Sequence, residues 1–256
     1  MRIPTGVSAD ALGGEECGRA TCTDATGVWA VVPAKGFARG KSRLDGVLTK
    51  AAREDVARSL CAHVLSTLST SGAIEGVLVA TDCPLVEVFA EARGAVVIRD
   101  DPWKSPVEGE GDVPIGSLAL VVDRALTVLA QRGARAALVV MADLPLLAPD
   151  DVRALVAALD RAPLVVAPDR AGNGTNALGL APPNRILTCF GSETSFHRHV
   201  ARAETEGLAF EIHRSEGTAF DLDSPDDLAL ALSARYAERG ARLSWNRKRP
   251  SRVSAA

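Results

Sequence analysis

The fold of this chain is set by the stretch Trp29-Ala-Val-Val-Pro-Ala-Lys-Gly-Phe-Ala-Arg-Gly-Lys-Ser-Arg-Leu44, which joins an apolar run to a cationic loop. The apolar residues 29–32 predict a short buried strand, which Pro33 and Gly36 end. Small residues in such a loop let the backbone approach a ligand, and closely spaced cations suit a polyphosphate. The cations are Lys35, Arg39, Lys41 and Arg43. The loop predicts a nucleoside triphosphate site, although a solvated basic turn also fits the loop alone.

Apolar runs alternate with segments of helical period over the next part of the chain. Buried strands are predicted at 28–33, 74–80, 95–98, 136–141 and 164–167, and helices at 50–68, 85–92, 115–129 and 149–159. This alternation predicts an α/β fold with three α/β/α layers and a mostly parallel, doubly wound sheet. Ligands of such sheets bind beyond the carboxyl ends of the strands. The Lys35 loop and Asp143 both follow strands, so we expect them at one edge.

The pattern loosens after residue 168. We predict a strand at 176–180, a helix after 189–199, a strand at 209–213, a strand ending in segment 220–225, and a terminal helix to about 239. The first 27 residues lack periodicity and the tail is basic. The sequence therefore predicts a flexible extension at 1–27, a single domain at 28–243 and a disordered basic tail at 244–256.

Composition excludes several classes of protein. The chain of 256 residues has a net charge of −3 and a pI near 5.9, which give no electrostatic basis for binding nucleic acid or an anionic membrane. Only 4% of the residues are aromatic, so base stacking along a nucleic-acid strand is not expected. No apolar run approaches the roughly 18–20 residues of a membrane span, and residues 1–27 lack the apolar core of a signal peptide. We therefore expect a cytoplasmic protein with no nucleic-acid or membrane partner.

Cysteine and histidine form no metal-site pattern. The five cysteines are scattered and none belongs to a Cys-x-x-Cys pair, which predicts reduced thiols rather than a zinc site or disulfides. In Phe196-His-Arg-His199 the two imidazole rings would splay apart on a helix, so a surface role is predicted for both histidines.

Acidic residues at two strand ends are the candidate metal ligands. Asp143 follows a buried strand, where a carboxylate commonly holds Mg²⁺ together with phosphates and water. Asp221 and Asp223 alternate along a predicted strand, so at most one is expected to face the site. The other is a candidate N-cap for the helix after Pro225. A turn or helix-initiating role for Asp143 is the competing interpretation. Together with the cationic loop, the aspartates suggest a metal-dependent nucleotidyltransferase.

Six short motifs occur in a specific order along the chain. They are Val32-Pro-Ala-Lys35, Lys41-Ser-Arg-Leu44, Asp143-Leu-Pro145, Asp169-Arg-x-Gly-x-Gly-Thr175, Phe190-Gly191 leading to Ser195-x-x-x-His199, and Asp221-Leu-Asp-Ser-Pro-Asp-Asp-Leu228. Each motif is modest alone, but the ordered set resembles the CofC family, the guanylyltransferases of coenzyme F-420 biosynthesis, over about residues 28–235. The resemblance implies a Rossmann-like, glycosyltransferase-A-like nucleotidyltransferase fold.

The resemblance also implies a reaction, in which GTP and a phosphorylated three-carbon acid give a guanosine-diphospho-linked acid and pyrophosphate. The acid is 2-phospho-L-lactate, phosphoenolpyruvate or 3-phospho-D-glycerate, and the last two are favoured here. An acceptor phosphate oxygen, already anionic, attacks the α-phosphorus of GTP in line. Positioning and charge neutralisation would therefore supply the catalysis.

Site residues follow from the motifs that match. The resemblance assigns catalysis to Lys35, Lys41, Arg43 and Asp143, and GTP binding to Pro33, Ala34, Lys35, Lys41, Ser42 and Arg43. It assigns the acid to Thr175, Gly191, Thr194 and Ser195, with Thr194 and Ser195 ambiguous by one place. The expected cofactor is Mg²⁺. Its implied ligands are Asp143 and Asp221, with Asp223 as a helper. A homodimer, and transfer of the product to the next enzyme of the pathway, are further expectations.

One segment departs from the family pattern. Members often carry Leu-Asn-x-Ala at the start of the helix after the acidic loop, whereas this chain has Pro114-Ile-Gly-Ser-Leu-Ala119. The base contact made there stays open. Two other functions stay open as well: nucleotidyl transfer to another acceptor, such as the pterin of molybdenum cofactor or a sugar phosphate, and nucleotide binding without catalysis. The Gly-rich loop typical of the first is absent, and retention of Asp143 and Asp221 argues against the second.

Overall fold

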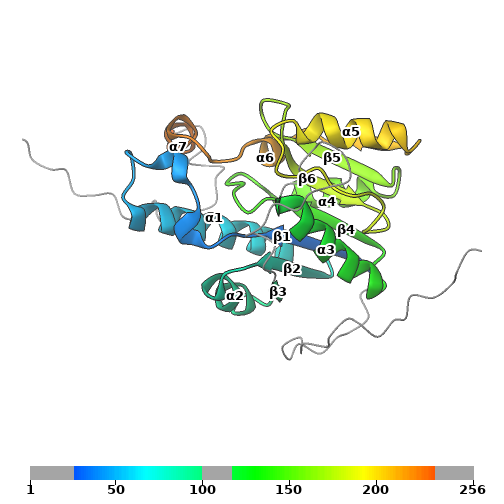
Figure 1. Ribbon diagram of the computed structural model, residues 1–256, viewed down its shortest axis with the longest axis horizontal. Coiled ribbons are helices and arrows are strands. Elements are labelled where there is room, and N and C mark those ends of the chain that lie inside the picture. The colour runs from blue at the N-terminus through cyan, green and yellow to red at the C-terminus, as the bar shows by residue number, and fades with distance from the viewer. Residues whose placement is uncertain (1–25, 100–116, 234–256) are drawn as a thin grey trace, which may run out of the picture.

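Seven short apolar runs pair into one sheet in the computed structural model, which describes residues 26–99 and 117–233 (Figure 1). The strands are β1 (Val28–Pro33), β2 (Gly76–Thr81), β3 (Val96–Arg99), β4 (Ala136–Val140), β5 (Leu164–Pro168), β6 (Thr175–Leu180) and β7 (Phe210–Ile212). Their order across the sheet is β3-β2-β1-β4-β6-β5-β7. The predicted tail and almost all of the predicted extension lie outside the described residues, as do residues 114–116 of the departing segment.

The sheet is mostly parallel, as predicted. β1 pairs in parallel with both β2 and β4, and β7 pairs in parallel with β5. The exception is β6, which runs antiparallel to β4 and β5. Only the short loop 169–174 joins β5 to β6, and it is closed by a hydrogen bond from the Asp169 amide to the Gly174 carbonyl (3.0 Å). A connection this short permits a hairpin but not the long crossover that a parallel pair requires.

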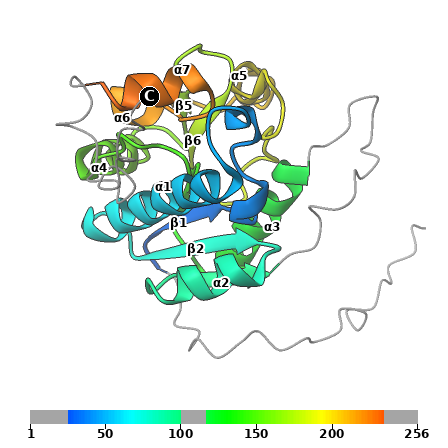
Figure 2. The same cartoon turned by 90° about the vertical axis from the view of Figure 1, so that its left-hand side faces the viewer.

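Helices cover both faces of the sheet, which gives the three predicted layers. Figure 2 shows α1 (Lys50–Thr70) and α4 (Pro149–Ala158) on one side, and α3 (Ser117–Gln131) and α5 (Ser195–Thr205) on the other. α2 (Pro84–Glu91) adds its buried side chains Val86 and Ala90 to the same core as α1 and α4. Side chains alternate along each strand, so Ala30 and Val32 enter one core and Trp29 and Val31 the other. Burial of apolar surface in each core contributes roughly 25 cal/mol per Å² to the free energy of folding. This is the main stabilising contribution.

Helix ends follow local chemistry that the sequence displays. The Thr49 hydroxyl caps α1 by accepting the Ala52 amide hydrogen (3.2 Å), and the Ser224 hydroxyl caps α7 (Pro225–Ala231) in the same way (3.2 Å). Pro84 and Pro149 open α2 and α4, where a missing amide hydrogen does no harm. The predicted elements up to 180 and the strand at 209–213 agree with the structure to within two residues at the described ends, whereas the helix predicted after 189–199 already begins at Ser195. No helix of the described segments is both long and apolar enough to cross a bilayer.

Segment 220–225 is where the prediction of a strand is wrong. A short helix, α6 (Glu216–Ala219), precedes it, and residues 220–223 form no strand. Leu222 is fully buried in a small third core with Leu44, Val56, Leu60 and Leu228. Its amide donates to the Asp143 carbonyl (3.1 Å), which ties the segment to the end of β4. Tertiary anchoring at Leu222 therefore replaces strand pairing. The terminal helix α7 is described to Ala231, and residues 234–239 of its predicted extent lie outside the described residues.

Candidate active site

The ammonium group of Lys41 lies between two carboxylates at the carboxyl edge of the sheet. Its Nζ is 2.7 Å from Asp143 Oδ2 and 2.8 Å from Asp223 Oδ1. The side chain of Lys41 is 7% exposed, whereas those of Asp143 and Asp223 are 27% and 42% exposed. We refer to Lys41, Asp143, Asp221 and Asp223 as the acidic cluster. The ion pairs join residues 102 and 182 positions apart, so the fold alone creates the contact.

The loop after β1 delivers Lys41 in an unusual backbone conformation. Lys41 has φ 57° and ψ 38°, in the left-handed region that L residues other than Gly, Asn and Asp rarely adopt. It separates two short 3-10 turns, η1 (Phe37–Arg39) and η2 (Ser42–Leu44), and the turn η2 ends on the buried Leu44. Anchoring of Leu44 in the third core thus holds the loop, and the left-handed residue turns its side chain toward the aspartates.

Burial and charge act in opposite directions on Lys41. Burial by itself lowers the pKa of the ammonium group, but the charges and hydrogen bonds of Asp143 and Asp223 outweigh burial, and the net pKa is raised. Lys41 is therefore a permanent cation at neutral pH.

The carboxylate of Asp221 has a raised pKa. Burial, and then the charges of Asp143 and Asp223, raise its pKa from 3.8 to about 6. The sequence pattern predicts that at most one of Asp221 and Asp223 faces the site and that the other caps a helix. The cap is wrong, because Ser224 caps α7. Asp223 pairs with Lys41, and Asp221 lies close enough for the charges of Asp143 and Asp223 to act on it.

Asn176 supports Asp221 and was missed in the sequence. Its side-chain Nδ2 donates to the Thr218 carbonyl (3.0 Å) and the Ala219 carbonyl (3.3 Å), and lies 3.5 Å from Asp221 Oδ1. The side chain is buried in β6, where an amide must find partners. A polar residue in an otherwise apolar strand was the signal that could have identified it.

The structure distributes the other predicted GTP-binding residues along the same loop. Pro33 and Ala34 are buried at the end of β1, and the Ala34 amide donates to the Ala80 carbonyl (2.9 Å). Lys35, Ser42 and Arg43 are exposed. Arg39 instead forms an ion pair with Asp82, at the end of the neighbouring strand β2. Lys41, by contrast, pairs with the carboxylates of Asp143 and Asp223.

The acidic cluster offers oxygen donors of the kind that Mg²⁺ prefers. Within residues 26–99 and 117–233, no three His, Cys, Asp or Glu side chains are arranged so that together they could hold a metal ion. Mg²⁺ in proteins is commonly held by one or two carboxylates, with substrate phosphates and water completing the octahedron. Asp143 and Asp221 fit that kind of site, and they do not form a closed protein cage.

Two of the four residues predicted to bind the acid, Thr175 and Ser195, contact His199. Thr175 and Ser195 are buried, whereas Gly191 and Thr194 are exposed. Gly191 has φ +87°, which a residue with a side chain would rarely adopt. The Phe196 amide donates to the Asn173 carbonyl (2.9 Å) and so joins the start of α5 to the loop before β6. The structure therefore brings Thr175 and Ser195 near one another from separate segments.

His199 itself corrects a prediction. A surface role was expected for both histidines of α5, and it holds for His197, which is exposed. His199 is fully buried, with its Nδ1 3.1 Å from Thr175 Oγ1 and its Nε2 accepting the Cys189 amide hydrogen (2.8 Å). We refer to Thr175, Cys189 and His199 as the histidine cluster. The amphipathic period of α5 places His199 on the same buried face as Phe196 and Ala203.

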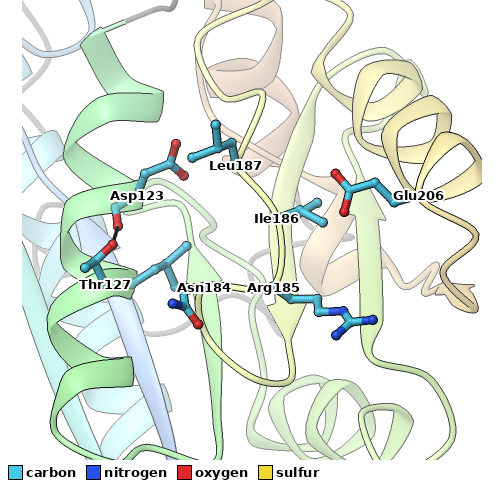
Figure 3. A pocket seen from close by; sticks show the side chains of 8 residues that line it. Asp123, Thr127, Asn184, Arg185, Ile186, Leu187 and Glu206 are labelled. Carbon is cyan, nitrogen blue, oxygen red and sulfur yellow. Dashed lines mark hydrogen bonds between the residues drawn. The ribbon is translucent and has the colours of Figure 1, made fainter. Parts of the chain in front are cut away.

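A separate cavity of about 250 Å³ lies between α3 and the segment 184–187 (Figure 3). Asp123 lines one side of it and Glu206 another, and the Thr127 hydroxyl donates to the Asp123 carbonyl (2.8 Å). None of its lining residues is a predicted site residue. The cavity therefore does not compete with the acidic cluster as the site of chemistry.

Known proteins share both the sequence pattern and the fold. Residues 28–233 match the family described as Guanylyl transferase CofC like. The chain is 39% identical over 199 residues to a phosphoenolpyruvate guanylyltransferase of Sphaerobacter thermophilus, covering 78% of this chain and 89% of that protein. It is 35% identical to the phosphoenolpyruvate guanylyltransferase of Conexibacter woesei, covering 83% and 90%.

Two solved structures are similar in fold at low sequence identity. A candidate nucleotide-diphospho-sugar transferase of Desulfovibrio desulfuricans G20 superposes with a TM-score of 0.68 at 14% identity, covering 87% of this chain and 94% of that one. A CMP:2-keto-3-deoxy-manno-octonic acid synthetase superposes with a TM-score of 0.53 at 16% identity, covering 83% and 100%. These likenesses support the predicted nucleotidyltransferase fold.

Proposed function

This chain belongs to the CofC family of guanylyltransferases, and on that premise we propose that it joins GMP from GTP to phosphoenolpyruvate with release of pyrophosphate. The names of the two relatives above support phosphoenolpyruvate among the three candidate acids. The reaction would belong to the biosynthesis of coenzyme F-420, to which the family resemblance points. The single observation that carries the chemistry is the Lys41 ammonium held between Asp143 and Asp223 at the carboxyl edge of the sheet.

The proposed step exchanges one phosphoanhydride bond for another. A phosphate oxygen of phosphoenolpyruvate forms a bond to the α-phosphorus of GTP, while the bond from that phosphorus to the bridging oxygen of the β-phosphate breaks. The attacking oxygen is anionic at neutral pH, so no side chain has to remove a proton. The electron pair leaves with pyrophosphate. The chain's tasks are therefore to align the two phosphates and to balance the charge of the leaving group.

Lys41 is suited to the second task. Its ammonium group is a fixed cation, and Asp143 and Asp223 hold it at the edge where the loop after β1 and the end of β4 meet. Lys35 and Arg43 on the same loop are exposed, and we propose that they add positive charge toward the phosphates of GTP.

We assign Mg²⁺ to Asp143 and Asp221, with Asp223 assisting. The crowding of like charges supports this assignment, since Asp143 and Asp223 contribute to the raised pKa of Asp221, and a cation beside them would relieve that repulsion. When bound, Mg²⁺ would neutralise charge on the phosphate oxygens.

The test is a pyrophosphate-release assay with GTP and each of the three acids, offered separately and in competition, with products identified by mass spectrometry. We expect a guanosine-diphospho-linked product with phosphoenolpyruvate, and loss of turnover when Mg²⁺ is chelated. Turnover with none of the acids would overturn the proposal. Turnover with a sugar phosphate or molybdopterin instead would identify a different acceptor. Binding of GTP without turnover would indicate a catalytically silent protein.

Chelation and nucleotide exchange refine the same assay. Full activity after chelation would remove Mg²⁺ from the proposal without affecting the acceptor. Replacing GTP by ATP or CTP tests the base, which matters because the segment that departs from the family pattern lies partly outside the described residues.

A further inference from the structure

His199 joins three segments of the acid-binding side through a single buried ring. It lies on α5, accepts the amide hydrogen of Cys189 at Nε2 (2.8 Å), and meets the Thr175 hydroxyl at Nδ1 (3.1 Å). The ring of Phe190 packs edge-on against it, with centroids 5.1 Å apart at an angle of 67°. The imidazole is fully buried, and besides Cys189 and Thr175 it has a hydrogen bond with the Ser195 backbone.

The two contacts determine which nitrogen carries the hydrogen. A backbone amide can only donate, so Nε2 accepts from Cys189 and bears no hydrogen. Burial, and then the charges of Arg202 and Arg198, lower the pKa of His199 to about 3, so the ring is neutral at neutral pH. A neutral imidazole has one N–H, and it must be at Nδ1.

The tautomer in turn determines the role of the Thr175 hydroxyl. Because Nδ1 carries the hydrogen, Thr175 Oγ1 can only accept from it at this contact. The hydroxyl hydrogen of Thr175 must then point elsewhere, and among the described residues the hydroxyl has no second hydrogen-bond partner. A buried hydroxyl with a directed, unused hydrogen is suited to donate to an anionic oxygen.

We propose that His199 is a positioning residue that holds the Thr175 hydroxyl as a donor toward an anionic oxygen of the acid substrate, its carboxylate or its phosphate. The proposal rests on the proposed function, because the acid is the ligand assigned to this side of the site. Fixing the hydroxyl before the acid binds avoids the loss of rotational freedom on binding. It also supplies a neutral donor, which complements the charged groups of the acidic cluster.

Two substitutions separate this directional role from simple filling of the core. His199→Gln is expected to keep an acceptor near the position of Nε2 for the Cys189 amide, and to lose the donor toward Thr175. His199→Asn is expected to keep a donor near the position of Nδ1 and to lose the contact with Cys189. We expect the KM for phosphoenolpyruvate to rise about 10-fold in His199→Gln and by clearly less in His199→Asn. The KM for GTP should stay within about twofold in both variants.

A double-mutant cycle with Thr175→Val tests whether His199 acts through Thr175. Thr175→Val alone should raise the KM for the acid about 10-fold. If the proposal is right, adding His199→Gln to Thr175→Val raises this KM no further. Additive losses, or a parallel rise in the KM for GTP together with a lower Tm, would mean that His199 acts only in packing and would overturn the proposal.

The tautomer can be read directly and without turnover. The ¹⁵N NMR spectrum of the unliganded full chain contains signals from four histidines, and the His199 signals are those lost in His199→Gln. We expect a hydrogen on Nδ1 and none on Nε2 at neutral pH, and the opposite tautomer would overturn the proposal. If no acid supports turnover, the proposed function fails. If turnover is normal but the tautomer is reversed, only the role of His199 fails.

Discussion

The acidic cluster and the histidine cluster, which we propose hold the two anionic substrates, do so with opposite chemistry. The acidic cluster contains charged groups that are partly exposed, with Asp223 42% exposed. The histidine cluster is neutral and buried, with His199 fully inaccessible. Charge acts over distance and tolerates imprecise geometry, whereas a neutral donor must be aimed. The comparison suggests that one side compensates the charge of a polyphosphate while the other orients a small acid.

Adjacent residues of β6 connect the two clusters. Thr175 contacts His199, which lies on the face of the sheet that α5 covers. Asn176 contacts the Thr218 and Ala219 carbonyls beside Asp221. Successive side chains of a strand point to opposite faces, so one strand can serve both clusters. The predictions below test whether the clusters are separable in this way.

The largest effect is expected from Asp143→Asn. It removes the charge that pairs with Lys41 and that we assign to Mg²⁺, so kcat should fall at least about 100-fold. Pyrophosphate release at saturating GTP and phosphoenolpyruvate measures it. The matched control is Asp150→Asn at the start of α4, whose side chain is 90% exposed. A rate near that of the wild type in Asp143→Asn would remove the acidic cluster from catalysis.

Lys41→Met should give the next largest effect. Loss of the ammonium group is expected to lower kcat/KM for GTP about 10- to 100-fold. It should also reduce the free energy of unfolding by about 1–2 kcal/mol, because it leaves two partly exposed carboxylates side by side. Steady-state kinetics and denaturant unfolding measure the two effects. Lys50→Met, at an exposed position that begins α1, is the control. A change in the KM for the acid, with kcat/KM for GTP unchanged, would mean that Lys41 acts on the acid rather than on GTP, and would contradict the proposed division between the clusters.

Asn176→Ala tests the separation of the clusters more finely. It deprives the Thr218 and Ala219 carbonyls of their donor, and should lower the free energy of unfolding by about 1–3 kcal/mol. Loosening of Asp221 should lower kcat about 10-fold, while the KM for the acid stays unchanged. Asn184→Ala, at an exposed position, is the control. A large rise in the KM for the acid would show that the two faces of β6 are coupled.

The smallest effect is expected at Asp123, a partly buried carboxylate outside both clusters. Burial raises its pKa from 3.8 to about 6, although its carboxylate accepts the Thr188 amide hydrogen (2.9 Å). The folded state therefore binds the proton more tightly than the unfolded chain, so the stability contribution is full below about pH 4 and is lost as the pH rises to about 6. Asp123→Asn keeps an acceptor oxygen and has no charge to bury.

We expect Asp123→Asn to be more stable than the wild type at pH 8, by about 1–3 kcal/mol, and to match it near pH 4. Denaturant unfolding at the two pH values measures the difference. Unchanged turnover would confirm that Asp123 belongs to neither cluster. A variant that is equally stable at both pH values would contradict the assigned cause.

Much of the candidate site could be predicted from the sequence, because its charged members stand beside readable signals. Asp143 follows an apolar strand, and Lys41 lies in the loop after another strand, so both belong at the carboxyl edge of the sheet. Segment 220–225 was misread because alternating polar and apolar residues suggest a strand. In the structure Leu222 is buried in a separate core, a contact with Leu44 and Leu60 that no local pattern reveals.

The sequence by itself determined the α/β class, the layers and the charged residues, because periodicity and charge belong to residues and their near neighbours. Tertiary structure decided that Lys41 reaches Asp143 and Asp223, since these pairings join residues 102 and 182 positions apart. It also decided the role of His199, which looks like a surface residue in isolation. Only the fold supplies a backbone amide on one side of the ring and a hydroxyl on the other, and these partners determine its tautomer.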